Sequence, residues 1–246
     1  MPLTNQEQER YNRHIILHDI RIQGQEKIKA TSILVVGAGG LGSPILYYLT
    51  AAGIGHIGIM DDDVVSESNL QRQILYDTTH VGTPKVTVAT TKLQQLNPFT
   101  RITPYFTRLS LDNALEIIPE YDIVMDATDN LHARYLINDA CVKLGKPFVY
   151  GSICEFRGQV SVFNYGPTYR DLFEYNEEIK NFSQPLGVIG ALPGIVGSLQ
   201  ANEAIKIILE NPGVLSGKLL TIDILNNTYL TFAIQKKERG EESLFK

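Results

Sequence analysis

Residues 32–63 read SILVVGAGGLGSPILYYLTAAGIGHIGIMDDD, and this stretch decides the fold. The continuous apolar run at 32–36 predicts a buried strand, since strands covered on both faces carry no polar alternation. The glycines at 37–42 predict a turn, residues 43–52 have the spacing of a helix, and residues 56–60 predict a second strand that ends at three aspartates. A strand, a crossover helix and a second strand form the unit from which parallel sheets are built.

Two uncharged stretches raise the question of a membrane span. Residues 30–60 and 181–202 contain no Asp, Glu, Lys or Arg. Both are interrupted by glycine and proline, and the periodicity of the first changes twice, which is not typical of a single spanning helix. We therefore predict elements of a globular domain and no membrane association.

The sequence up to residue 155 continues the alternation of strands and helices. The predicted helices cover 4–14, 85–96, 111–118 and 134–144, and the predicted strands cover 101–106, 122–127 and 147–150. This order predicts an α/β, Rossmann-like fold with a mainly parallel sheet and helices on both of its faces.

The last part of the chain has a different pattern, typical of an antiparallel extension. The elements predicted there are a strand at 159–163, a polar and mobile crossing segment at 165–185, a helix at 194–209, and strands at 218–225 and 228–234. Asn226 and Asn227 tolerate the positive φ of a tight hairpin between the last two strands. We predict one domain, made of a nucleotide-binding part (1–155), an antiparallel extension with the crossing segment (156–235) and a charged tail (236–246).

The composition excludes several functional classes. The chain has 246 residues, 43% of them hydrophobic, and a net charge of −5, which gives it no general attraction to nucleic acid or anionic membranes. Its two cysteines, Cys141 and Cys154, cannot make a disulfide framework or a four-thiolate zinc site. The start, MPLTNQE, lacks the basic and apolar regions of a signal peptide, so we predict a cytoplasmic protein.

A nucleotide-binding signal follows the first strand. Gly37, Gly39 and Gly42 form G-x-G-x-x-G between a predicted strand and a predicted helix, where backbone N–H groups can approach a phosphate. Asp61 stands nineteen residues after Gly42, at the end of the second strand, where a carboxylate can accept hydrogen bonds from ribose hydroxyls. On its own this pattern predicts an adenine nucleotide and favours NAD.

The residues beyond Asp61 favour a triphosphate. Residues 68–73 read SNLQRQ and place amides and Arg72 beyond the ribose end, and Lys85 opens the next helix. A guanidinium binds two phosphate oxygens and an ammonium adds a mobile charge, more than a dinucleotide needs. The strand at 122–127 leads into Thr128-Asp129-Asn130, where a carboxylate can hold Mg²⁺ against phosphates.

The combination of these motifs resembles the ThiF/MoeB/HesA family, bacterial relatives of ubiquitin-activating enzymes. The resemblance covers about residues 9–232 and includes the RYNRH at 10–14, the glycine turn, the motifs above and the GSLQA at 197–201. It implies a homodimer that uses ATP and Mg²⁺ to adenylate the C-terminal Gly-Gly carboxylate of a small ubiquitin-like sulfur carrier, of the ThiS or MoaD type, in thiamine or molybdopterin biosynthesis.

The resemblance also implies roles for single residues. Gly40 would lie against the nucleotide with the other glycines, Asp61 would bind ribose, Asp129 would bind Mg²⁺, and Arg13 would reach the partner subunit's triphosphate. The remaining residues that would contact the nucleotide are Ser68, Asn69, Gln71, Arg72, Gln73, Lys85 and Asn130. Arg13, Arg72, Lys85 and Asp129 form the catalytic set, and no acid–base residue is needed because the transfer depends on alignment and charge neutralisation.

The chain departs from the family pattern at two places. Many relatives bind zinc through two Cys-x-x-Cys pairs; here residues 167–171 read PTYRD and no second pair follows, so zinc is not expected. Relatives often carry a cysteine in the crossing segment, and the approximate counterpart here is Ser183, whose hydroxyl is a poor substitute for a thiolate. We therefore predict adenylation without a thioester on this chain, with sulfur supplied by a separate protein.

Two alternative functions and several minor sites remain. A nicotinamide-dependent dehydrogenase shares the glycine turn but does not explain the cationic residues, and a scaffold that binds a ubiquitin-like protein does not need a complete triphosphate site. Cys141 is predicted to be a core residue, and Cys154 lies near the expected site. His14 and His18 have the spacing of a helical metal pair but lack a third ligand.

Overall fold

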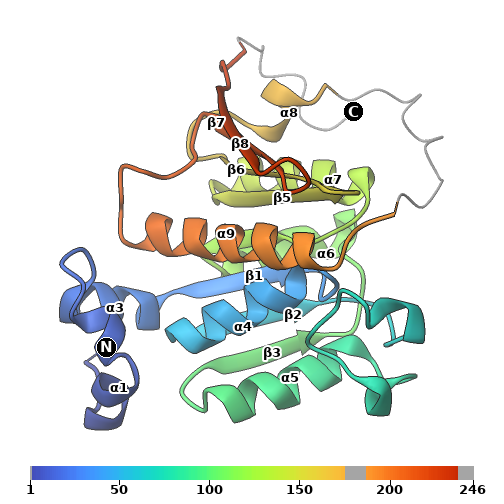
Figure 1. Ribbon diagram of the computed structural model, residues 1–246. Coiled ribbons are helices and arrows are strands. Elements are labelled where there is room, and N and C mark those ends of the chain that lie inside the picture. Colours follow the sequence, from blue (N-terminus) through green and yellow to red (C-terminus); the bar gives the residue numbers. More distant parts are fainter. Residues whose placement is uncertain (1, 175–186, 238–246) are drawn as a thin grey trace.

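The computed structural model describes residues 2–174 and 187–237, which build one eight-stranded sheet in the order β3-β2-β1-β4-β5-β6-β7-β8 (Figure 1). The strands from β3 to β5 in this order run parallel, and β5 to β8 pair antiparallel. The strands are β1 (Ser32–Val36), β2 (His56–Met60), β3 (Arg101–Tyr105), β4 (Ile123–Asp126), β5 (Phe148–Cys154), β6 (Arg157–Phe163), β7 (Lys218–Asp223) and β8 (Thr228–Ala233). The predicted mainly parallel sheet with an antiparallel extension is confirmed.

Helices cover both faces of the sheet. They are α1 (Asn5–Arg10), α2 (Asn12–Ile15), α3 (Arg21–Ala30), α4 (Gly42–Ala52), α5 (Lys85–Leu96), α6 (Leu111–Ile117), α7 (Leu131–Leu144), α8 (Tyr169–Leu172) and α9 (Ala191–Ile208). One core joins α4, α5 and α9 to the sheet, and a second core joins α6, α7 and α8 to its other face (Figure 1). Alternate residues of β1 enter different cores: Ile33 packs in the first and Leu34 in the second, which is why this strand is apolar throughout.

The chain reverses its direction of winding between β1 and β4. From β1 it proceeds to β2 and β3 on one side, and then returns to place β4 on the other side of β1. In an open parallel sheet such a reversal leaves a crevice at the carboxyl ends of the two central strands. The glycine turn after β1 and the Thr128-Asp129-Asn130 loop after β4 both lie at this edge, which we call the carboxyl edge of the sheet.

The N-terminal region differs from its prediction. The helix expected at 4–14 is divided at Tyr11, whose ring is buried against Gly53 and whose hydroxyl accepts a hydrogen bond from Asn97 Nδ2 (2.8 Å). No element was predicted where α3 forms. The buried face of α3 includes Gly24 and Gln25, so the sequence here lacks the apolar spacing by which an amphipathic helix is recognised.

The crossing segment is also better ordered at its start than expected. The sequence predicts that residues 165–174 belong to a mobile stretch, but they contain α8. Tyr169 is 1% exposed and packs among Tyr135, Phe148 and Tyr150. Aromatic burial of this kind fixes the segment in place. The remainder of the predicted crossing segment, from residue 175, lies outside the described residues.

The other predicted elements shift mainly at their ends. β5 extends to Cys154 because it pairs with β6 over seven positions, and α9 begins at Ala191 because Pro193 lies in its first turn, where proline is tolerated. Asn227 has a φ of +52°, as predicted for the hairpin, although the turn spans 224–227. Within residues 2–174 and 187–237, no helix combines the length and apolarity needed to cross a membrane.

We expect acid to destabilise the protein through His56. The buried imidazole lies 2.8 Å from Arg101 Nη2 at Nδ1 and 2.9 Å from Thr103 Oγ1 at Nε2. Since arginine can only donate, Nδ1 is the acceptor and the ring is neutral. Burial and Arg101 lower the pKa of His56 below its ordinary value of 6.5. The unfolded chain therefore binds the proton more readily, and this part of the stability is present above pH 6.5 and lost as the pH falls through the lower folded-state pKa.

Urea unfolding between about pH 5 and pH 8 measures this effect. His56→Gln is expected to flatten the decline in unfolding free energy toward acid pH, whereas His18→Gln, at an exposed position, is expected to leave it unchanged. Equal pH slopes in His56→Gln and the unchanged protein would contradict the assignment.

Candidate functional site

The glycine turn is shaped by two close backbone contacts. Gly37 has a φ of +99°, and a Cβ there would lie 2.5 Å from the Ala127 carbonyl oxygen. A Cβ on Gly42 would lie 2.2 Å from the Gly37 carbonyl oxygen. Side chains are therefore excluded at both positions, and the turn lies directly against the end of β4 while α4 begins at Gly42. The helix N-terminus so placed is suited to bind an anion.

Asp61 is joined to the glycine turn. Its Oδ2 accepts from Ala38 N (2.7 Å) and its Oδ1 from Asp63 N (2.8 Å), while Tyr76 Oη donates to the Ala38 carbonyl (2.7 Å). The Ala38 peptide is thus held from both sides. Burial raises the pKa of Asp61, and the charge of Lys85 and these two N–H groups oppose that rise. A carboxylate has about four acceptor positions, so Asp61 can still receive ribose hydroxyls.

The segment predicted to contact phosphates lies across the turn from Asp61. Ser68 and Gln71 are exposed, Asn69 and Arg72 are half-buried, and Gln73 is buried with its side chain facing Gly39. Arg72 Nη1 donates to the Ser68 carbonyl (3.1 Å) and its stem faces Gly40, which also lies close to Pro193 of α9. Gly39, Gly40 and Arg72 therefore lie in one part of the carboxyl edge.

Lys85 brings a buried positive charge to the same place. Its side chain is 4% exposed and its Nζ lies 2.9 Å from Asp63 Oδ2. An ammonium has three N–H donors, and Asp63 receives one of them. Asp63 itself is 64% exposed, so this ion pair lies at the boundary of the site and holds the ammonium close to Asp61.

The loop after β4 presents Asp129 to solvent. Asp129 and Asn130 are exposed, and Asn130 Oδ1 accepts from Ala133 N (2.7 Å), so Asn130 is the N-cap of α7. Mg²⁺ is usually held by one or two carboxylates together with phosphate oxygens and water. An exposed carboxylate beside a phosphate-binding turn fits this donor set, and Asp129 would hold the ion there.

Several residues that support the site were not identified from the sequence. Tyr76 anchors the glycine turn, Asp126 and Arg134 bracket Thr128, and Gln200 donates to the Asp126 carbonyl (2.7 Å). Asp126 carried a detectable signal, since it is an ionisable residue inside a strand predicted to be buried. The contacts of Tyr76 and Gln200 join distant parts of the chain and leave no local pattern, whereas Arg134 lies only six residues after Thr128.

Arg13 lies far from this edge within its own chain. The helices that carry it contact the ends of α4 and α5: Tyr11 packs against Gly53, and Arg10 Nη1 donates to the Leu96 carbonyl (3.0 Å). Figure 1 shows α1 and α3 at the opposite end of the strands from the glycine turn. Arg13 is exposed. It therefore cannot complete the site of its own chain.

The remaining candidate metal ligands also contact other residues. The carboxylate oxygens of Asp61, Asp62 and Asp63 lie within 4.8 Å of one another, and Asp62 also pairs with Arg108 (3.1 Å). His14 Nδ1 contacts Gln25 Oε1 (3.1 Å), whereas His18 Nδ1 pairs with Asp19 (3.2 Å).

The two cysteines differ in burial, and the serine predicted to replace a family cysteine is not among the described residues. Cys141 is buried in the second core, as predicted, and burial strongly raises the pKa of its thiol. Cys154 is half-buried at the end of β5. Residues 167–171 lie at and around α8, where Arg170 makes two hydrogen bonds to the Asp139 carboxylate (2.7 and 2.6 Å). Ser183 lies outside the described residues.

Solved structures share this fold. E. coli MccB with MccA-N7isoAsn superposes with a TM-score of 0.84 over 95% of this chain and 74% of that chain, at 20% identity. PaaA superposes with a TM-score of 0.81 over 96% of this chain and 76% of that chain, at 22% identity.

Curated proteins are more similar in sequence. A probable molybdopterin-synthase adenylyltransferase of Porphyra purpurea is 50% identical over 93% of this chain and 61% of its own length. The adenylyltransferase and sulfurtransferase MOCS3 of Culex quinquefasciatus is 49% identical over 96% of this chain and 55% of its length. The sulfur carrier protein adenylyltransferase of Thermus thermophilus is 46% identical over 97% of this chain and 92% of its length. This chain thus spans 55–61% of the first two relatives.

The family match covers almost the whole described chain. The ThiF family matches residues 11–243, a range that includes the glycine turn, Lys85, the loop after β4 and α9. Together with the shared fold and the identity to these relatives, this match shows that the chain belongs to the ThiF family.

Proposed function

We propose that this protein adenylates the C-terminal Gly-Gly carboxylate of a small ubiquitin-like sulfur carrier, using ATP and Mg²⁺. The observation that carries the proposal is the convergence of the glycine turn, Arg72 and Lys85 at the carboxyl edge, beside the exposed carboxylate of Asp129. Relatives named as molybdopterin-synthase and sulfur carrier protein adenylyltransferases support the same reaction.

The chemistry needs charge neutralisation more than acid–base catalysis. A carboxylate oxygen of the carrier attacks the α-phosphorus, the bond to the bridging oxygen breaks, and pyrophosphate leaves with its electron pair. The carrier carboxylate is already ionised at neutral pH, so no base is needed. Arg72 and Lys85 would bind the phosphates, and the N–H groups of the turn would orient them. Mg²⁺, when bound at Asp129, supplies further positive charge against the departing pyrophosphate.

We also propose that two copies share each site. Arg13 can serve a nucleotide site only if it belongs to a second chain, because within its own chain it lies at the other end of the sheet. Such a pairing would bring the amino ends of one copy's strands beside the carboxyl edge of the other.

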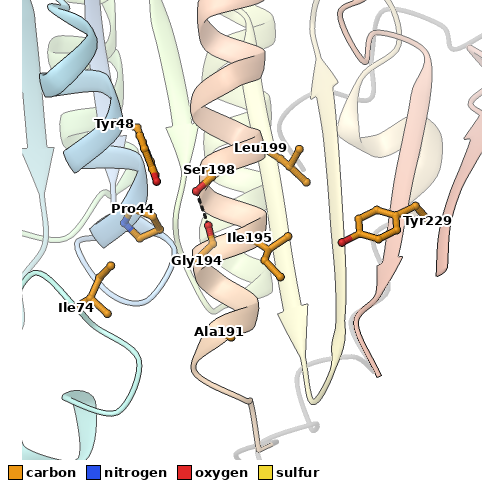
Figure 2. A pocket seen from close by; sticks show the side chains of 9 residues that line it. All are labelled: Pro44, Tyr48, Ile74, Ala191, Gly194, Ile195, Ser198, Leu199 and Tyr229. Carbon is orange, nitrogen blue, oxygen red and sulfur yellow. Dashed lines mark hydrogen bonds between the residues drawn. The ribbon is translucent and has the colours of Figure 1, made fainter. Parts of the chain in front are cut away.

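An apolar hollow on α4 and α9 is a suitable surface for this pairing. It has a volume of about 520 Å³, and Figure 2 shows Tyr48 of α4, Ile195 and Leu199 of α9, and Tyr229 of β8 around it. Tyr48, Ile74 and Tyr229 are each more than half exposed. Exposed apolar surface of this kind favours a protein partner, and the partner we propose is a second copy, which would also supply Arg13.

The other parts of the function remain predictions. They are the choice between a thiamine-type and a molybdopterin-type carrier, the separate sulfur donor, the lack of a zinc requirement and the cytoplasmic location. The dehydrogenase alternative is less well supported, because the buried ammonium of Lys85 has no role in hydride transfer.

ATP–pyrophosphate exchange with candidate carriers ending in Gly-Gly tests the proposed reaction. We expect exchange that requires Mg²⁺ and one particular carrier, since pyrophosphate can return to ATP only through an acyl-adenylate. Binding of a carrier without exchange would instead favour the scaffold, and binding of NAD without exchange would favour a dehydrogenase.

Subunit mixing tests the shared site. Arg13→Ala and Asp129→Ala are each expected to lower exchange by about 10²-fold or more, because each removes charge stabilisation at the phosphates. Random mixing of the two variants should restore about a quarter of the activity, since half of the dimers are mixed and each carries one intact site. Purified mixed dimers without activity would contradict the sharing of Arg13.

Cys154→Ser tests whether a thiol takes part in adenylation. Cys154 lies beside a second hollow lined by Arg157, Gln159 and Asp223, close to the carboxyl edge. We expect exchange to change by no more than about twofold, because the nucleophile is the carrier's carboxylate. A loss comparable to that of Asp129→Ala would show that Cys154 belongs to the site.

A further inference from the structure

The loop that carries Asp129 is anchored by a buried ion pair. Asp126, the last residue of β4, is 0% exposed and its Oδ2 accepts from Arg134 Nε (3.2 Å). Its Oδ1 accepts from Thr128 N (2.9 Å) and from Thr128 Oγ1 (2.6 Å). One carboxylate therefore receives the guanidinium of α7 and two donors of Thr128.

Arg134 also binds Thr128 directly, through the Thr128 carbonyl. Its Nη2 donates to the Thr128 carbonyl (3.1 Å) and lies 3.5 Å from the Gly151 carbonyl, and its guanidinium lies over the Tyr150 ring at 5.4 Å from the centroid. The N–H, the hydroxyl and the carbonyl of Thr128 thus all have partners in the pair of Asp126 and Arg134. Asn130, on the other side of Asp129, is fixed as the N-cap of α7.

The carbonyl that precedes this loop is also fixed. Gln200 Nε2 donates to the Asp126 carbonyl (2.7 Å), and the Gln200 amide packs directly on Gly151 of β5. The backbone of β4 pairs with that of β5 at Val124 and Met125, and this pairing ends before Asp126. Side chains from α7 and α9 therefore hold the end of β4 on the side where its backbone pairing with β5 has ended, while pairing with β1 continues to Asp126.

We propose that Arg134 is a positioning residue: through Asp126 and Thr128 it fixes the backbone on which Asp129 is presented to the metal. Asp129 is exposed while both of its neighbours are held, so its backbone position is set and its carboxylate is open to solvent. A lysine would keep the charge but not the planar fork, which reaches Asp126 and two carbonyls at once. The role of Asp129 rests on the proposed function.

The test measures metal binding directly. Mn²⁺, which replaces Mg²⁺ and has an electron paramagnetic resonance signal, is titrated in the presence of α,β-methylene-ATP, and no carrier is added. We expect Arg134→Lys to weaken Mn²⁺ binding about tenfold or more, as for other groups that orient a metal ligand. In the Asp129→Asn background, Arg134→Lys should have no further effect, because Arg134 acts on the metal only by positioning Asp129.

Arg170→Lys is the matched control. Arg170 also makes a buried ion pair with a residue of α7, Asp139, at side-chain exposures of 11% and 10%, but it does not hold Thr128. A merely structural role predicts similar losses of thermal stability and unchanged Mn²⁺ affinity in both variants. If Arg134→Lys does not fold, Thr128→Val removes the hydroxyl bond to Asp126 at a less buried position and should weaken Mn²⁺ binding in the same direction.

The outcomes separate this proposal from the proposed function. Equal Mn²⁺ affinity in the unchanged protein and in the folded variant would overturn the positioning role, as would a failure of the unchanged protein to bind Mn²⁺ with the nucleotide. Weakened binding in Arg134→Lys, without exchange for any carrier, would support the positioning role and contradict adenylation.

Discussion

The contact between Gly37 and the Ala127 carbonyl is the constraint on which the site depends. Because no side chain fits between them, the turn after β1 and the end of β4 lie against each other at the point where the chain reverses its winding. The glycine turn and the loop of Asp129 are thereby brought together by backbone geometry. Every other feature of the carboxyl edge is built around these two segments.

The polar residues of this edge hold one another in place through hydrogen bonds and ion pairs. Asp61 and Tyr76 hold the Ala38 peptide, Asp63 holds the ammonium of Lys85, and Asp126 with Arg134 holds Thr128. Burying these groups is unfavourable unless they are paired, and pairing makes their geometry rigid. A site whose donors are already oriented needs little reorganisation when charge develops, as the adenylation proposed above requires.

The sequence predicted the parallel sheet well, because β1 and its neighbours are continuous apolar runs separated by glycine turns and amphipathic helices. It predicted less where the signal lies in tertiary contacts. α3 has few buried apolar side chains, and β5 is longer than expected because β6 pairs with it. The packed start of the crossing segment depends on Tyr169 meeting five other aromatic rings. In the same way, nothing near Tyr76 in the chain indicates that it fixes Ala38, which lies 38 residues away.

The junction of β4 and β5, where the two halves of the sheet meet, affects which parts of the protein can change during evolution. The backbone pairing there is short, and the two halves of the sheet are joined beside the site by the side chains of Gln200 and Arg134. Strand β8, whose residues are all exposed, can therefore accumulate substitutions with little strain on the parallel half of the sheet. The outer edge of the sheet is in this way free to vary in sequence while the geometry around the glycine turn is kept.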